Sequence, residues 1–361
     1  MWYKNDVTKN LRTKYPIIQA GMAGGVTTPE LVASVSNSGG LGTIGAGYMS
    51  VTDLNESIKQ VKKQTNLPFG VNVFIPEEPE YTEDQINQMQ ELLKPSMKEL
   101  NLFNDDPFTL KQIDFERQIE SIIEERVPVC SFTFGIPPKE IMKELKKESI
   151  QVIGTATTVE EALINQECGV DLIVAQGSEA GGHRGTFLGT YDESMIGTFS
   201  LLPQVVDAVE VPVIAAGGVM DGRGVVAALA LGAKGVQMGT AFLTNKESGA
   251  KEIHKKAILQ AEETSTTLTS AFSGKPARGI TNSFIHMMKE YENQILPYPV
   301  QNALTKELRR EAGNQRNPEF MSLWSGQSPR LSKDVNVHEL MDSLVMEVEK
   351  GIHRLTGQLR L

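Results

Sequence analysis

Cysteine is nearly absent from this chain of 361 residues, in which only Cys130 and Cys168 occur. Neither belongs to a CxxC pair or to a cluster with metal-ligand spacing, so we expect no disulfide framework and no metal site. Two isolated thiols are typical of a protein from a reducing compartment, and we therefore expect a cytoplasmic location.

Long apolar runs and an excess of basic residues are also missing. No stretch reaches the roughly 18 apolar residues of a membrane span, and the polar segment 1–14 has no apolar core of a secretion signal. Acidic residues outnumber basic ones by 45 to 35, giving a formal net charge of −10. Nucleic-acid binding would need a basic face, so we expect neither nucleic acid nor a membrane as partner.

Short apolar runs recur along the chain, each followed by turn residues and a helical pattern. Nearly continuous runs of this kind are typical of parallel strands covered by helices. They are residues 17–21, 41–45, 69–74, 127–134, 151–155, 171–175, 212–217 and 235–242. Alternating strands and helices fit a closed barrel or an open doubly wound sheet, and eight strands favour an α/β fold of the (β/α)8, or TIM barrel, type.

Helical periodicity is clearest in four of the intervening segments: 29–38, 51–64, 158–166 and 222–231. Residues whose side chains can cap a helix stand near their starts, and we predict N-caps at Thr28, Thr52, Thr157 and Asp221.

Two stretches interrupt the alternation, and they suggest a cap. Residues 76–114 are too many for an ordinary βα loop, and residues 262–334 mix turn residues with helix-like pieces. We predict a barrel of residues 1–261 with an insertion at about 76–114, and a helical cap of residues 262–334 over the barrel mouth. Residues 335–361 would add a C-terminal helix that returns to the barrel, since 335–355 is amphipathic.

Glycines gather after the last two predicted strands, in 217–224 and in Gln237-Met238-Gly239-Thr240. Residues past the strand ends face the active site of such a barrel, and phosphate sites recur at these two loops. Glycine lets backbone N–H groups approach an oxyanion, and a helix N-terminus adds a favourable dipole. Tight turns alone would explain one such loop; two adjacent loops favour phosphate binding.

The loop after the sixth predicted strand, residues 176–185, carries Glu179, His183 and Arg184 in a glycine-rich frame. Imidazole is the natural proton acceptor near neutral pH, so His183 is the candidate catalytic base. A structural hydrogen bond is the alternative role for this histidine. Glu179 and Arg184 could instead form a solvated ion pair.

Small residues around Met22, after the first strand, leave room for a flat ring system. Asn72 interrupts an apolar strand and needs partners if it is buried. The edge of a flavin ring could supply them. Alternatively, the Asn72 side chain could hydrogen-bond the unpaired backbone groups of a β-bulge.

Taken together, these segments resemble the nitronate monooxygenase family, class I, of bacteria. The resemblance rests on 16–25 with 38–42, 70–74, 176–185 and 212–242, and less on Leu323-Trp324-Ser325-Gly326-Gln327. It implies an FMN enzyme that uses O2 to convert a nitronate, such as propionate 3-nitronate, or a nitroalkane to a carbonyl compound and oxidised nitrogen. It also implies that His183 is the base and that FMN is held by Met22, Asn72, Gln176, Gly181, Gly218, Gln237, Met238, Gly239 and Thr240.

Substrate contacts are expected from Thr133, Tyr298 and Lys306. Many members of the family would carry histidine where Thr133 stands, which affects the polar lining of the pocket. Tyr298, Asn302 and Lys306 follow at i, i+4 and i+8, one face if that piece is helical. A solvated helix face is the alternative, and a monomer and a homodimer are both compatible with the sequence.

Three other functions remain open. An FMN-dependent enoyl-[acyl-carrier-protein] reductase would share the glycine and histidine motifs but use NAD(P)H. A barrel similar to inosine-monophosphate dehydrogenase would share the phosphate loops, but neither Cys130 nor Cys168 is placed for its catalytic loop. A non-catalytic barrel that binds a phosphate ligand is the weakest alternative, because it leaves His183 without a role.

Overall fold

The computed structural model describes residues 1–102, 108–111 and 113–358. Its main sheet has eight parallel strands in the order β1-β9-β8-β6-β5-β4-β3-β2. A parallel bridge between Ile18 and Leu41 joins the two ends, so the sheet is a nearly closed (β/α)8 barrel, as predicted. The strands are β1 (Ile17–Gln19), β2 (Gly42–Gly45), β3 (Phe69–Phe74), β4 (Val129–Thr133), β5 (Gln151–Ala156), β6 (Leu172–Gln176), β8 (Val213–Ala216) and β9 (Gly235–Met238).

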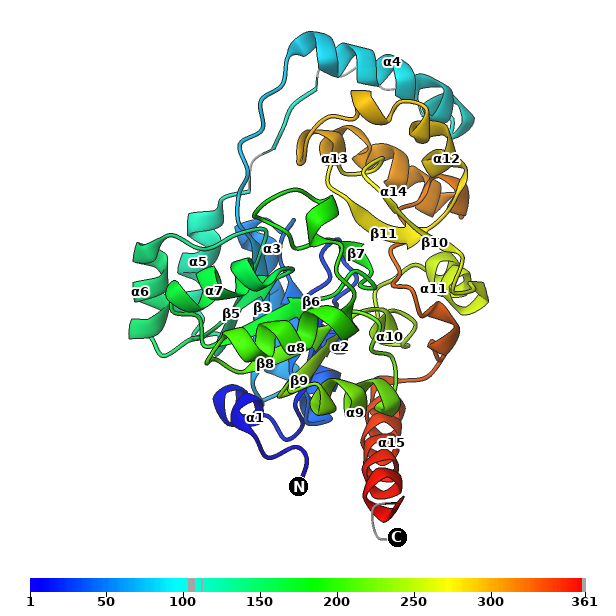
Figure 1. Cartoon of the computed structure of the whole chain (residues 1–361). Helices are drawn as coiled ribbons and strands as arrows, with labels where there is room; N and C mark the ends of the chain where they lie inside the picture. The colour runs from blue at the N-terminus through cyan, green and yellow to red at the C-terminus, as the bar shows by residue number, and fades with distance from the viewer. Residues whose placement is uncertain (103–107, 112, 359–361) are drawn as a thin grey trace.

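Helices surround the strands on the outside of the barrel (Figure 1). They include α2 (Pro29–Asn37), α3 (Val51–Gln64), α5 (Phe115–Glu124), α6 (Lys139–Lys147), α7 (Val159–Glu167), α8 (Thr198–Ala208), α9 (Gly222–Ala230) and α10 (Thr240–Leu243). The strand residues that alternate toward these helices form the main apolar core with them. The four predicted helices are all present.

Side-chain capping decides where these helices begin. Thr28 and Asp221 are N-caps, as predicted. The caps of α3 and α7 are Ser50 and Thr158, so the predictions of Thr52 and Thr157 were wrong by one or two residues. The Thr157 hydroxyl instead hydrogen-bonds the carboxylate of Glu161 at 2.7 Å.

A separate apolar cluster fills the inside of the barrel and its amino-terminal end. Ile18, Ile153, Val174 and Ile214 project inward there, where α1 (Asp6–Leu11) packs beneath them through its buried apolar residues. Helix α1 lies in the segment 1–14, for which the sequence predicted no element. It closes the end of the barrel opposite the expected site.

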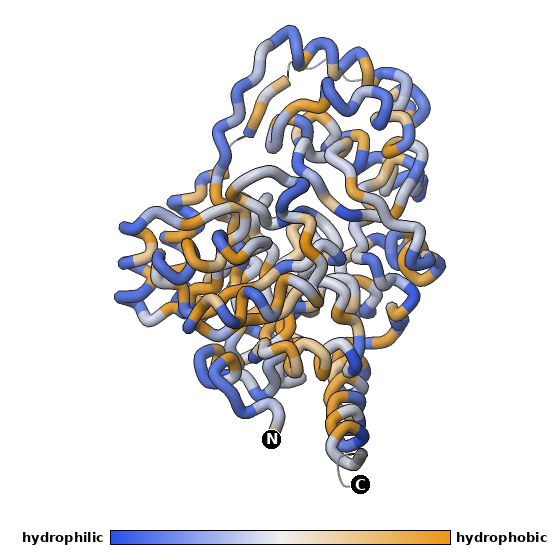
Figure 2. Tube along the Cα trace, viewed as in Figure 1, coloured by the Kyte–Doolittle hydropathy of each residue, from blue (hydrophilic) through white to orange (hydrophobic). Residues whose placement is uncertain are grey.

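The remaining elements form a layer above the carboxyl ends of the strands (Figure 1). They are α4 (Glu83–Glu99), α11 (Glu252–Gln260), β10 (Thr266–Thr269), β11 (Ala277–Ile280), α12 (Ser283–Lys289), α13 (Val300–Leu304) and α14 (Lys306–Asn314). They share an apolar core that includes Met89, Phe272 and Phe284. Figure 2 shows α4 as largely hydrophilic on its outward side. Part of the predicted insertion, residues 103–107 and 112, lies outside the described residues.

The last helix, α15 (Val337–Gln358), packs on α9 and α2. The end of this predicted segment, residues 359–361, lies outside the described residues. Short 3-10 turns complete the chain at Asp192–Ser194, Glu292–Gln294, Pro318–Phe320 and Pro329–Leu331. Within the described ranges, every helix is too short or too polar to cross a membrane.

Candidate active site

His183 lies where the barrel and the overlying layer meet. With Gly182 it forms the two-residue strand β7 (Gly182–His183), which pairs antiparallel with β11 in a three-stranded sheet. The pairing continues where the N–H of Arg184 donates to the carbonyl of Pro276 at 3.0 Å. The backbone of the candidate base is therefore held by a strand from the segment that the sequence predicts as the cap.

Aromatic side chains enclose the imidazole of His183. The ring centroids of Trp324, Phe134 and Tyr298 lie 5.5, 5.9 and 6.2 Å from its own. The Nε2 atom is 2.8 Å from the hydroxyl oxygen of Ser273, a residue of the overlying layer. Three rings and one hydrogen bond fix the imidazole plane and keep bulk water from much of its surface.

Burial lowers the pKa of His183 to about 3, and the positive charges of Lys275 and Arg309 add to this effect. The imidazole is therefore neutral at neutral pH, so it can accept a proton but has none to spare as an imidazolium acid. The Lys275 ammonium lies 4.7 Å from the ring centre of Phe134 and pairs with Glu77. Burial also raises the pKa of Tyr298, which keeps its phenol protonated.

Polar side chains from neighbouring strands meet below the histidine. The amide nitrogen of Asn72 on β3 donates to the hydroxyl oxygens of Ser131 and Thr133 on β4, at 3.0 and 3.1 Å. The amide oxygen of Gln176 on β6 accepts from the N–H of Gly185 at 2.8 Å. The structure thus brings Asn72, Thr133 and Gln176 to the carboxyl end of the barrel, where Asn72 keeps an amide oxygen without a donor among the described residues.

A glycine cradle lies beside this group, at the two loops singled out in the sequence. Gly217 and Gly218 have φ of +103° and +73°, a backbone conformation that favours glycine. A Cβ on Gly239 would meet only Met22 and Ala20 among the described residues within 4 Å, at 3.6 and 3.8 Å. Protein packing therefore does not require glycine at Gly239, and the open backbone there fits the close approach of a phosphate.

Four further residues expected at the cofactor have distinct surroundings. The hydroxyl of Thr240 accepts from the N–H of Gly326 at 2.9 Å. A Cβ on Gly181 would lie 2.5 Å from that same nitrogen, so Gly181 is a point of close chain approach. Met238 packs into the outer core, which leaves only its backbone for a cofactor, whereas Gln237 is half-buried in β9.

Glu179 and Arg184 are structural and do not form the solvated ion pair considered for them. The Glu179 carboxylate accepts from the N–H and the hydroxyl of Thr198 at the start of α8, both at 2.8 Å. Arg184 is 2% exposed and donates to the carbonyls of Gln176 and Ser194. Together they fix the two ends of the loop that carries His183.

Lys306 does not share a helix face with Tyr298. Helix α13 begins after Tyr298, and Lys306 is an exposed residue at the start of α14. The Arg309 guanidinium, one turn later, donates to the carbonyl and side-chain oxygens of Asn302 at 2.7 and 2.8 Å. One face was expected only if residues 298–306 form one helix, and they do not, because Tyr298 precedes α13 and Thr305 separates α13 from α14.

The cations that act on His183 are thus Lys275 and Arg309, and sequence analysis missed both. Lys275 follows a glycine turn and reaches the site only because β11 pairs with β7. Arg309 could have been found from the helical spacing, since it lies at i+3 from Lys306. Ser273 had no signal in the sequence, because its contact with His183 joins residues 90 positions apart.

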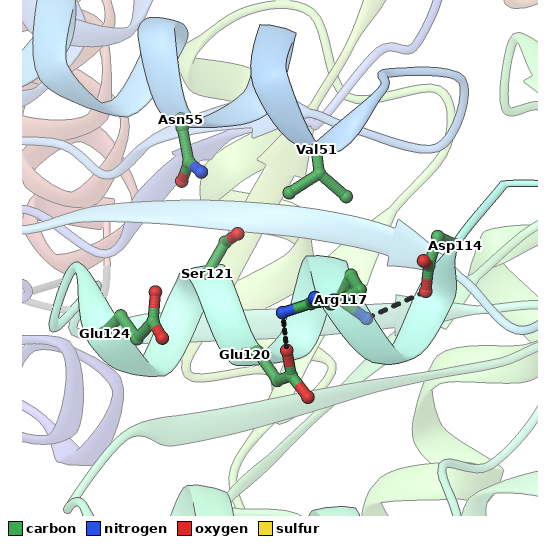
Figure 3. A pocket seen from close by; sticks show the side chains of 7 residues that line it. All are labelled: Val51, Asn55, Asp114, Arg117, Glu120, Ser121 and Glu124. Atoms are coloured by element: carbon green, nitrogen blue, oxygen red, sulfur yellow. Dashed lines mark hydrogen bonds and ion pairs between the residues drawn. The ribbon is translucent and has the colours of Figure 1, made fainter.

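A shallow pocket of about 370 Å³ lies away from this site, between α3 and α5 on the barrel wall (Figure 3). Its lining includes Asn55, Asp114 and Ser121, and Arg117 pairs there with Glu120 at 3.0 Å. None of the expected site residues lies in it. In the part of the chain that the structure describes, no three His, Cys, Asp or Glu residues are grouped so as to hold a metal ion.

A histidine enclosed by aromatic rings, beside a glycine cradle at the carboxyl end of a (β/α)8 barrel, is the arrangement of a barrel enzyme, whose active site lies at that end. The profile of the nitronate monooxygenase family matches residues 5–347. The chain belongs to this family, which is flavin-dependent.

Relatives and solved structures agree with this assignment. A probable nitronate monooxygenase of Staphylococcus haemolyticus (strain JCSC1435) is 55% identical over 97% of this chain and 98% of the relative. Nitroalkane oxidase from Streptomyces ansochromogenes is 36% identical, with a TM-score of 0.89 over 97% of this chain and 100% of that one. FabK from Thermotoga maritima is 31% identical, with a TM-score of 0.78 over 98% and 99%.

Proposed function

We propose that this nitronate monooxygenase binds FMN and uses dioxygen to convert alkyl nitronates, propionate 3-nitronate among them, to carbonyl compounds and nitrite or nitrate. The observation that carries the proposal is the neutral imidazole of His183 beside a cradle suited to a single phosphate. No G-x-G-x-x-G dinucleotide fingerprint follows any strand, which supports FMN over FAD.

The proposed cofactor contacts come from backbone and side-chain groups at the carboxyl end of the barrel. Backbone N–H groups at Gly218, Gly239 and Thr240 would bind the phosphate, while Asn72 and Gln176 would contact the ring system. The chemistry that FMN supplies when bound is acceptance of electrons from the nitronate and their delivery to dioxygen. Gly181, Gln237, the backbone of Met238 and the side chain of Met22 complete the proposed cofactor contacts.

His183 would accept the carbon proton of a neutral nitroalkane, since its low pKa keeps the imidazole unprotonated. Lys275 and Arg309 would attract the negative charge of the nitronate, and Phe134, Tyr298 and Trp324 would exclude water. The residues predicted to form a cap, 262–334, supply all of these groups except His183 and Phe134. We propose that they act as a cap over the site.

A visible spectrum of the purified protein, followed by anaerobic addition of a nitronate, tests the proposal. We expect oxidised-flavin absorbance that nitronate bleaches, whereas NADPH with a crotonyl thioester leaves it unchanged. Chromatography of the heat-released cofactor should yield FMN. Recovery of FAD would overturn the cofactor assignment, and bleaching by NADPH with turnover of the thioester would favour the enoyl reductase.

A further inference from the structure

Ser273 is buried in the segment between β10 and β11, and its hydroxyl has three polar neighbours. The Nε2 atom of His183 and the carbonyl oxygen of Lys275 each lie 2.8 Å from its Oγ. The backbone N–H of Lys275 donates to the Oγ of Ser273 at 3.3 Å. Ser273 thus bonds the catalytic base on one side and the backbone of its own turn on the other.

The number of protons available determines the direction of each bond. A serine hydroxyl has one proton to donate and two lone pairs that accept. The Lys275 carbonyl can only accept, and Ser273 is its only donor in the described part of the chain. If the hydroxyl proton went to Nε2 instead, the Ser273 Oγ and the Lys275 carbonyl oxygen would face each other at 2.8 Å without a proton between them, and a part-buried carbonyl would lose its partner.

We propose that Ser273 is a positioning residue that holds neutral His183 as its Nε2–H tautomer and so leaves Nδ1 as the atom that accepts the substrate proton. The hydroxyl proton goes to the Lys275 carbonyl, and Ser273 Oγ accepts from the imidazole. The proposal rests on the proposed function for the identity of the substrate, but not for the tautomer itself.

The other neighbours of the His183 imidazole leave Ser273 to determine its tautomer. The Nδ1 atom has no hydrogen-bond partner in the described residues, so nothing else there selects a tautomer. Phe134, Tyr298 and Trp324 restrict rotation of the ring, which prevents an exchange of the two nitrogens by a flip. Lys275 and Arg309 disfavour the doubly protonated ring, in which no nitrogen could act as a base.

Nitrogen-15 NMR of the flavin-loaded enzyme, labelled in its five histidines, tests the assignment without any substrate. The signals of His183 are identified by their loss in His183→Asn. At pH 7 we expect a protonated Nε2 and an unprotonated Nδ1. A protonated Nδ1, alone or together with Nε2, would overturn the proposal even if the enzyme oxidised nitronates as proposed.

Substitution of the serine provides the second readout. Ser273→Ala should move the tautomer ratio toward the Nδ1–H form by roughly tenfold, the worth of one hydrogen bond. Nitroalkane turnover should fall more than nitronate turnover, and Ser273→Thr, which keeps the hydroxyl, should restore both readouts. An unchanged tautomer ratio in a folded Ser273→Ala would contradict the positioning role. If that variant does not fold, the spectrum of the wild type still decides.

Discussion

His183 is the residue on which the proposed chemistry depends. A neutral nitroalkane must lose a carbon proton before it can be oxidised, whereas a nitronate has already lost it. General bases typically contribute about 10²- to 10⁴-fold. We therefore expect His183→Asn to lose at least about 10²-fold in kcat/KM on nitroalkanes and to keep appreciable activity on nitronates. Equal losses on both substrate forms would mean that His183 binds or orients and is not a base.

Lys275 offers a second test at the scale of single residues, with a matched control on α14. Lys275→Met should raise KM for nitronates roughly tenfold, because the loss of an attraction of about 1.4 kcal/mol weakens binding about tenfold. It should also raise the pKa of His183 by removing a repulsive charge. Lys306→Met removes an exposed cation and should leave KM unchanged. Similar effects from both variants would indicate that only long-range charge matters.

At the scale of elements, a buried carboxylate links α7 to the loop beyond the candidate base. Glu161 is fully buried, and its carboxylate accepts from the N–H of Thr157 at 2.6 Å and from those of Phe187 and Leu188 at 2.6 and 2.9 Å. The helix therefore holds the loop that follows Arg184 against the barrel.

Glu161→Gln replaces one acceptor oxygen with an amide that faces N–H donors. Loss of buried partners of this kind costs about 1–3 kcal/mol. We expect the free energy of unfolding, measured in urea at constant flavin concentration, to fall by about that amount. Glu160→Gln on the exposed side of α7 should change it little. Equal stability of the two variants would show that the loop is held in some other way.

The elements also show why the sequence was informative about the barrel and less so about the overlying layer. Each barrel strand is apolar on both faces or nearly so, and that local pattern identified all eight. The strand β7 has two residues and exists only because β11 pairs with it, so no local pattern marks it. Asn72 could be singled out because it is a polar residue in an apolar strand, and Gln176 and the glycine loops because they lie at strand ends. Ser273 and Lys275 could not, since their role comes from tertiary contacts, whereas the helical spacing from Lys306 could have indicated Arg309.

At the scale of the whole molecule, two histidines with lowered pKa values link stability to pH. Burial lowers the pKa of His254 to about 4, although its bond to the Trp324 carbonyl, at 3.0 Å, partly opposes this. The unfolded chain binds a proton near the ordinary value of 6.5, whereas the folded chain does not until about pH 4. Stability is therefore full above 6.5 and falls as the pH is lowered through this interval. His183 acts in the same direction.

His254→Gln isolates the contribution of His254 to this pH dependence. Glutamine can still donate to the carbonyl of Trp324 but does not titrate. Between pH 7 and pH 5 we expect the wild type to lose about 2 kcal/mol more than the variant, since one pKa unit corresponds to ~1.4 kcal/mol. Urea unfolding at both pH values, with the same free flavin, measures the difference. Parallel pH profiles would show that His254 is protonated in the folded state.

The small sheet of β7, β10 and β11 has a mechanical consequence. Because β7 carries His183 and β11 belongs to the layer above, backbone hydrogen bonds join the candidate base to that layer. If the layer moved away from the barrel as a hinged lid, these backbone hydrogen bonds would break at each opening. The motion would also displace His183. Substrate and product must therefore pass beside this sheet, through motions of side chains or of the flanking segments. Residues that line the path of the substrate can then change during evolution and alter the substrate range, while the β7–β11 pairing that holds His183 is kept.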